Sequence, residues 1–115
     1  MDKKLSEVLR SCKLPLCTLH YFSRDITGEI IAACGWGGLL IKANNGYPFD
    51  DDRVSALVPL TIQTLKQFGI DEDFAIPLPG KPESLYTVPQ AVYYMNDVLN
   101  YTRDQQADYL AQFGL

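Results

Sequence analysis

Three short apolar, β-prone runs between Leu16 and Asn44 constrain the fold of this chain more than any other feature. The runs cover about residues 17–24, 28–34 and 38–43. A polar turn at 25–28 and a glycine-rich turn at 35–38 separate them. Short apolar runs bounded by turn residues are typical of hairpin strands. The sequence therefore predicts a three-stranded antiparallel meander.

Side-chain alternation along these runs predicts which face of the meander is covered. Two four-residue turns place Arg24 opposite Glu29, and Leu19 opposite Cys34. One predicted face is nearly all apolar and carries Leu19, Tyr21, Ile30, Ala32, Cys34, Leu39, Ile41 and Ala43. The other is mixed and carries His20, Phe22, Arg24, Glu29, Ile31, Ala33, Leu40 and Lys42. We expect helices to cover the apolar face. The apolar members of the mixed face then call for a partner, self-association or cover from within the chain.

Helical periodicity is found on both sides of the meander. Residues 2–13 place Leu5, Val8, Leu9 and Cys12 on one stripe, and Pro15 ends that helix. A central helix is predicted after the acidic residues 50–52. Pro59 predicts a kink in it, or a split into two helices near Val58. Gly69 followed by Ile70 predicts a Schellman stop.

The last third of the chain carries two helix-start signals. Thr87 and Thr102 are each followed three residues later by glutamine, which is the pattern of a capping box. They predict a C-terminal helical hairpin. The proline-rich residues 71–86 are expected to form an extended surface crossing, with Phe74 and Ile76 against the body. Together these elements predict a single α+β domain over residues 1–115, with the N-terminal helix, the kinked central helix and the hairpin on one face of the meander.

Composition narrows the class of protein. Hydrophobic residues make up 47% of the chain and charged residues 21%, which is ordinary for a globular domain. No apolar run is long enough to span a membrane, and the polar N-terminus lacks a signal-peptide pattern, so we expect a cytoplasmic protein. The net charge is −4, and the ten Lys and Arg are scattered. This charge disfavours nucleic-acid binding and is compatible with a basic protein partner.

Metal and cofactor motifs are not expected. The three cysteines, Cys12, Cys17 and Cys34, have no CxxC spacing, so reduced buried thiols are the simplest interpretation. Adding His20 to them matches no zinc pattern. The acidic run 50–52 lacks the spacing of a calcium loop. We therefore predict no metal and no cofactor.

Cys34 begins the most unusual motif, Cys-Gly-Trp-Gly-Gly. A thiol beside exposed backbone N–H groups is the arrangement that a cysteine nucleophile needs. His20 is the only imidazole, and in the predicted register it points to the opposite face. Cysteine catalysis is therefore the third hypothesis, and a non-enzyme is preferred. The same loop, Gly35, Trp36, Gly37 and Gly38, is the candidate rim of a small-ligand pocket.

Aromatic residues suggest a protein-binding surface. Trp36 on a hairpin tip is a common type of interface anchor. The last third of the chain contains five tyrosines. Tyr94 and Tyr101 are seven residues apart on the helix predicted after Thr87, which places them together with Asp97 nearby. The candidate partner-binding residues are Trp36, Tyr94, Tyr101, Asp97 and Phe22.

The function that these patterns favour is that of a small acidic interaction protein that inhibits or modulates a partner protein. Bacterial immunity proteins and phage-encoded inhibitors are analogous in size and charge alone. The second hypothesis is a domain that binds or sequesters a nucleotide or metabolite. Self-association is compatible with either.

Overall fold

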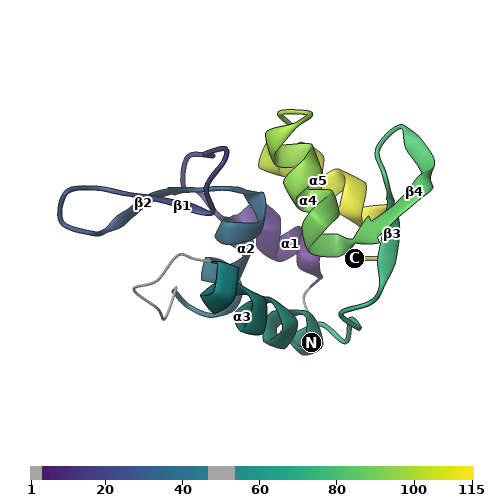
Figure 1. Cartoon of the computed structure of the whole chain (residues 1–115), viewed down its shortest axis with the longest axis horizontal. Helices are drawn as coiled ribbons and strands as arrows, with labels where there is room; N and C mark the ends of the chain where they lie inside the picture. Colours follow the sequence, from purple (N-terminus) through teal and green to yellow (C-terminus); the bar gives the residue numbers. More distant parts are fainter. Residues whose placement is uncertain (1–3, 47–53) are drawn as a thin grey trace.

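The computed structural model describes residues 4–46 and 54–115. Within these residues the fold is α+β, with five helices and two separate two-stranded antiparallel sheets (Figure 1). The elements in chain order are α1 (Leu5–Ser11), β1 (Phe22–Arg24), β2 (Ile30–Ala33), α2 (Gly35–Ala43), α3 (Val54–Gln67), β3 (Ala75–Leu78), β4 (Lys81–Thr87), α4 (Val88–Asp97) and α5 (Arg103–Ala111).

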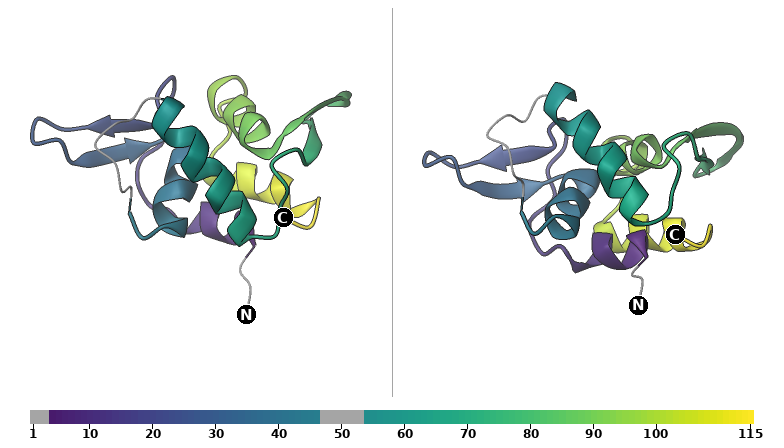
Figure 2. Two further views of the ribbon diagram at one scale, coloured as in Figure 1. Left: turned by 60° about the horizontal axis from the view of Figure 1, so that its bottom comes forward. Right: turned by 90° about the horizontal axis from the view of Figure 1, so that it is seen from below.

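The helices form the middle of the molecule and the two hairpins lie at its ends. Figure 2 shows the β1–β2 hairpin projecting at one end and the β3–β4 hairpin at the other. α1 packs against α2 and α5, and α2 also packs against α3 and α4. The buried apolar side chains from these elements belong to one cluster. No helix in the described ranges is long and apolar enough to cross a membrane.

The predicted third strand is wrong, because residues 38–43 belong to α2. The glycines at 35–38 form the first turn of this helix instead of a hairpin turn. Cys34 is its N-cap residue, and its Sγ accepts a hydrogen bond from the Gly37 N–H at 3.3 Å. Every residue from 33 to 40 is buried. A short apolar run has no periodicity that separates a buried strand from a buried helix, so tertiary packing decided the outcome.

Glycine in α2 is explained by close backbone packing. A Cβ on Gly37 would lie 2.4 Å from the backbone oxygen of Tyr21. One on Gly38 would lie 2.9 Å from Cys12 Sγ, and one on Gly35 would lie 1.9 Å from Gln106 Oε1. Because three neighbouring segments approach this closely, the helix keeps residues that intrinsic propensity disfavours.

The predicted strand register and the predicted buried face are also wrong. The observed pairs are Phe22 with Ala33 and Ser23 with Ala32, and an irregularity then shifts Arg24 to Ile30. Phe22 and Ala33 are buried, whereas Leu19 of the predicted apolar face is 77% exposed. The predicted helix cover of the Leu19, Ala32 and Ile41 face is therefore not found. The reason is α2, which packs on the Phe22 side of the hairpin, with Phe22 Cε1 only 3.1 Å from the Cβ position of Gly37.

The turn and helix signals are largely confirmed. Asp25 accepts the N–H groups of Thr27 and Glu29, which closes the predicted β1–β2 turn. The apolar stripe of α1 is buried as expected. Gly69 has φ +71°, and Ile70 N–H bonds to Leu65 O at 3.0 Å, which is the predicted Schellman stop.

The central helix differs from its prediction in one respect. α3 runs through Pro59 as one helix, and the alternative of a split near Val58 is not found. Pro59 lies on an exposed part of the helix, where water can satisfy the backbone carbonyl that it leaves without a partner. The predicted acidic start at 50–52 lies outside the described residues.

Residues 71–86, which the sequence predicts to form an extended surface crossing, form most of the β3–β4 hairpin. Gly80 has φ +76° and closes the turn, following Pro79. Ile76 is buried as expected, while Phe74 is exposed. The capping boxes at Thr87 and Thr102 begin α4 and α5, so the predicted helical hairpin is confirmed.

The close approach at Gly37 provides a test, because helix propensity and packing predict opposite effects of a Gly37→Ala substitution on the free energy of unfolding. Helix propensity alone predicts that Gly37→Ala stabilises the protein by about 1 kcal/mol. We expect destabilisation by about 1–3 kcal/mol, because the new methyl group meets a backbone oxygen that cannot rotate away. Urea unfolding followed by circular dichroism measures the difference. Gly38→Ala is the control and should cost less, because its neighbours are side-chain atoms of Cys12 and Arg103. Stabilisation by Gly37→Ala would contradict the packing of α2.

Candidate functional site

Two of the predicted partner-binding residues lie in the core. Trp36 is only 2% exposed, and its Nε1–H donates to Thr61 Oγ1 at 3.0 Å. Phe22 is buried against α2. The expectation that Trp36 stands on a hairpin tip is wrong, because residue 36 lies in the first turn of a central helix. Neither ring is on the surface that a partner would contact.

The predicted glycine rim does not form a pocket. Gly35, Gly37 and Gly38 are buried in α2 beneath Gln106, Tyr21 and Cys12. The Gly35 N–H donates to Asn96 Oδ1 at 2.9 Å. This N–H group is therefore occupied within the chain, and the loop interpretation of the motif is corrected.

Tyr94 and Tyr101 do not share a helix. α4 ends at Asp97, and Tyr101 lies in the turn before α5, where its N–H donates to Met95 O at 2.8 Å. The prediction that one helix carries both tyrosines is therefore wrong. Tyr94 and Asp97 remain on α4. The rings of Tyr94 and Tyr101 are both half-buried.

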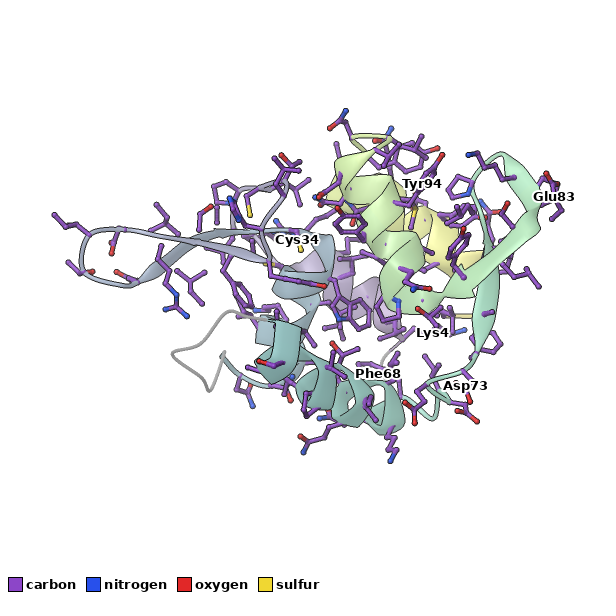
Figure 3. The ribbon with its side chains drawn as sticks, in the orientation of Figure 1. Lys4, Cys34, Phe68, Asp73, Glu83 and Tyr94 are labelled. Carbon is purple, nitrogen blue, oxygen red and sulfur yellow. The ribbon has the colours of Figure 1, made fainter. Side chains whose placement is uncertain are left out.

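A hollow of about 320 Å³ lies between α4 and the β3–β4 hairpin. Its lining residues are Leu78, Lys81, Tyr86, Gln90, Tyr93 and Tyr94, which we call the tyrosine surface. Tyr93 is 51% exposed and Tyr86 is 44% exposed. The Lys81 ammonium lies 5.5 Å from the centre of the Tyr94 ring, a cation–π contact. Figure 3 shows Tyr94 on α4 and Glu83 on the outer part of the hairpin.

Tyr86 and Tyr93 were missed as individual site residues. Their signal in the sequence is the concentration of tyrosine in the last third of the chain. The hairpin that brings Tyr86 to α4 was not predicted, so the two rings could not be paired from sequence. The structure thus keeps Tyr94 from the predicted set and adds two more exposed rings beside it.

A second, smaller cavity of about 30 Å³ adjoins the tyrosine surface through Tyr93. It is lined by Leu19, His20, Tyr21, Cys34, Tyr93 and Asp97. This volume has room for about one water molecule. Asp97 Oδ2 accepts the Leu19 N–H at 3.0 Å, and Asn96 Nδ2 donates to Cys17 O at 2.9 Å. These bonds hold the segment 17–21 against α4.

Cys34 and His20 were expected on opposite faces, and this prediction is wrong, because both line the small cavity. The geometric objection to thiol chemistry is thereby removed. An electrostatic objection remains, because burial raises the pKa of Cys34 to about 11. The hydrogen bond from the Gly37 N–H lowers this pKa but does not offset burial. At neutral pH only about one Cys34 in ten thousand is then a thiolate. Burial also raises the pKa of the neighbouring Tyr21.

The position of Asp97 does not make a metal site of this cavity. Across residues 4–46 and 54–115, no group of three or more His, Cys, Asp or Glu is arranged to hold a metal ion. The carboxylate oxygens of Asp97 accept hydrogen bonds from Leu19 N–H and Asn96 Nδ2. Asp97 thus orders the segment that covers Cys34.

The raised pKa of Cys34 predicts slow alkylation. In the native chain, iodoacetamide should label the partly exposed Cys17 before Cys34 near neutral pH, because the reactive form is the thiolate. Labelling of Cys34 should rise roughly tenfold per pH unit toward its pKa. Mass spectrometry of tryptic peptides measures each rate, and urea-unfolded chain is the control in which the cysteines react alike. Fastest labelling at Cys34 in the native chain would contradict the burial of this thiol.

Comparisons with protein-family models, with curated proteins and with solved structures find no match to this chain. What the chain does is therefore inferred from its own residues. The feature that most resembles a binding site in the described residues is the tyrosine surface with its hollow.

Proposed function

We propose that this chain is a cytoplasmic interaction protein that binds a partner protein through the tyrosine surface and inhibits or modulates it. The observation that carries the proposal is the pair of rings at the hollow, Tyr93 and Tyr86, which are 51% and 44% exposed. They come from different elements, α4 and β4. Large rings that stay in solvent beside a hollow are the usual anchors of protein interfaces.

The chemistry of the surface supports a protein partner. Tyrosine offers a large apolar area with little conformational entropy to lose on binding, and its hydroxyl can remain hydrated. A hollow of about 320 Å³ has room for an apolar side chain of the partner. Lys81 and Gln90 supply polar groups at its edge. An apolar centre with a polar rim is the common anatomy of an interface.

Charge favours a basic partner. The chain has a net charge of −4, and carboxylates lie on both elements that form the hollow, Glu83 on β4 and Asp97 on α4. Opposite net charge speeds association of two proteins, and the effect weakens as salt is added. A basic partner would therefore associate more slowly at high ionic strength.

Alanine substitution of the two rings tests the proposal. Tyr93→Ala and Tyr86→Ala should each weaken binding by about 2 kcal/mol, or roughly thirty-fold in Kd, if these rings are anchors. Leu85→Ala is the matched control. Leu85 is 62% exposed and adjacent to Tyr86, but strand alternation points it to the other face of β4.

The measurement has two stages. The full chain first recovers a partner from native lysate, and the Kd of the purified pair is then measured for each variant by calorimetry at two salt concentrations. Weaker binding by the tyrosine variants, with little change in the Kd of Leu85→Ala, supports the proposal. Equal affinity of all variants, or equal loss that includes Leu85→Ala, would rule out the tyrosine surface as the interface.

The same hollow favours a second candidate function, the binding of a nucleotide or metabolite. Its volume of about 320 Å³ falls in the range of small-molecule sites. The tyrosine rings offer faces for a flat ring system, and the Lys81 ammonium offers a charge for an anionic group. This site replaces the glycine rim that the sequence suggested.

A thermal-shift screen against nucleotides and common metabolites tests this candidate. A ligand at one hundred times its Kd adds about 2.7 kcal/mol to the free energy of unfolding, so a true ligand raises the melting temperature clearly. The shift should disappear in Tyr93→Ala and persist in Leu85→Ala. No shift across the set, or a shift that Tyr93→Ala retains, would exclude the hollow as the ligand site.

A further inference from the structure

Ala33 at the end of β2 pairs with two segments at once. On one side it pairs with Phe22 of β1. On the other it forms a parallel bridge with Leu16, in which the Ala33 N–H donates to Pro15 O at 3.0 Å and the Cys17 N–H donates to Ala33 O at 3.3 Å. The chain before the first hairpin therefore runs alongside the end of β2 in the same direction.

Cys17 and Cys34 directly follow the two residues of this bridge, Leu16 and Ala33. Cys34 still has an extended backbone, with φ −70° and ψ 177°. Paired strands lie about 4.8 Å apart, and residues opposite one another in a parallel pair point to the same side. The Cα separation that a disulfide requires is about 4.4–6.8 Å, and a parallel pair that continued for one residue beyond the bridge would satisfy it. Burial is the largest cause of the raised pKa of Cys34, and the charge of Cys17 also raises it.

We propose that Cys17 and Cys34 form a reversible disulfide that responds to oxidation. Cys17 is the thiol that reaches solvent, since it is partly exposed, and its Sγ donates only to the backbone oxygen of His20, at 3.4 Å. Cys34 is the buried partner, located at the start of α2 in Figure 3. Cys12 is buried elsewhere, against Gly38, and takes no part.

Glutathione disulfide is a sufficient oxidant for this bond. The Cys17 thiolate attacks one sulfur of glutathione disulfide, forms a mixed disulfide and releases one glutathione thiolate. The Cys34 thiol loses its proton, and its sulfur attacks Cys17 Sγ and releases the second glutathione thiolate. Two protein thiols are oxidised, one glutathione disulfide is reduced, and the two protons end on the two glutathione molecules.

The bond would change the segment that borders the tyrosine surface. The disulfide would draw Cys34 Sγ away from the Gly37 N–H, whose hydrogen bond this sulfur accepts in the reduced chain. It would also tie residues 17–21 to the start of α2. Leu19, His20 and Tyr21 of this segment form one wall of the small cavity beside Tyr93. A transient disulfide of this kind is the form that cytoplasmic proteins use for redox sensing. The inference does not depend on the proposed function.

Redox titration of the full chain tests the proposal. The protein is equilibrated at pH 8 in buffers of reduced and oxidised glutathione, free thiols are blocked with iodoacetamide, and tryptic peptides are analysed without reduction. Cleavage after Lys13, Arg24 and Lys42 leaves Cys17 and Cys34 on separate peptides, 14–24 and 25–42, and Cys12 on a third. We expect a 14–24/25–42 conjugate that has lost two hydrogen atoms and that dithiothreitol separates.

Two variants and a stability measurement complete the test. Cys12→Ala should keep the conjugate and Cys17→Ser should abolish it, and circular dichroism shows that each variant is folded. The oxidised wild-type chain should melt at a higher temperature than the reduced chain, because the bond restricts the unfolded state. A stable glutathione adduct on Cys17 with Cys34 still free would overturn the proposal. A conjugate that involves Cys12 would also overturn it.

Discussion

The buried N-terminus of α2 is the constraint on which the other packing in this chain depends. A helix end in the core leaves backbone N–H groups that water cannot reach, and an unpaired one is costly. Here the Gly35 N–H is accepted by Asn96 of α4, and the Gly37 N–H by Cys34. Asn96 Oδ1 also accepts from Gln106 of α5. The start of α2 therefore fixes α4 and α5 in relation to the first hairpin.

Hydrogen bonds from the same helices also position the segments that form the small cavity beside the tyrosine surface. Arg103 of α5 donates to the backbone oxygens of Leu14 and Ala33, and Asn96 donates to Cys17 O. These bonds hold the chain before β1 alongside the end of β2, where Leu16 and Ala33 form their bridge. Asp97, next to Asn96, holds Leu19 in turn. The small cavity is thus built from groups whose first role is structural, which agrees with a neutral Cys34.

Local signals in the sequence were reliable where a few adjacent residues satisfy one another. The capping boxes at Thr87 and Thr102, the Schellman stop at Gly69 and the Asp25 turn all form as expected, because their hydrogen bonds close within about six residues. The β3–β4 hairpin was missed although Pro79 and Gly80 are turn residues. The candidate site was therefore predicted least well, because only that hairpin brings Tyr86 close to Tyr93.

Sequence patterns alone sufficed for the α+β class, for the starts of the two capped helices α4 and α5, and for the tyrosine-rich composition of the last third. Long-range packing decided that residues 35–43 form a helix, that Trp36 is buried, and that Cys34 lines a cavity with His20. The physical reason is that α2 has three early glycines and no local preference strong enough to choose its conformation. Its conformation is set by distant partners, which accept its N–H groups and occupy the space that glycine side chains leave free.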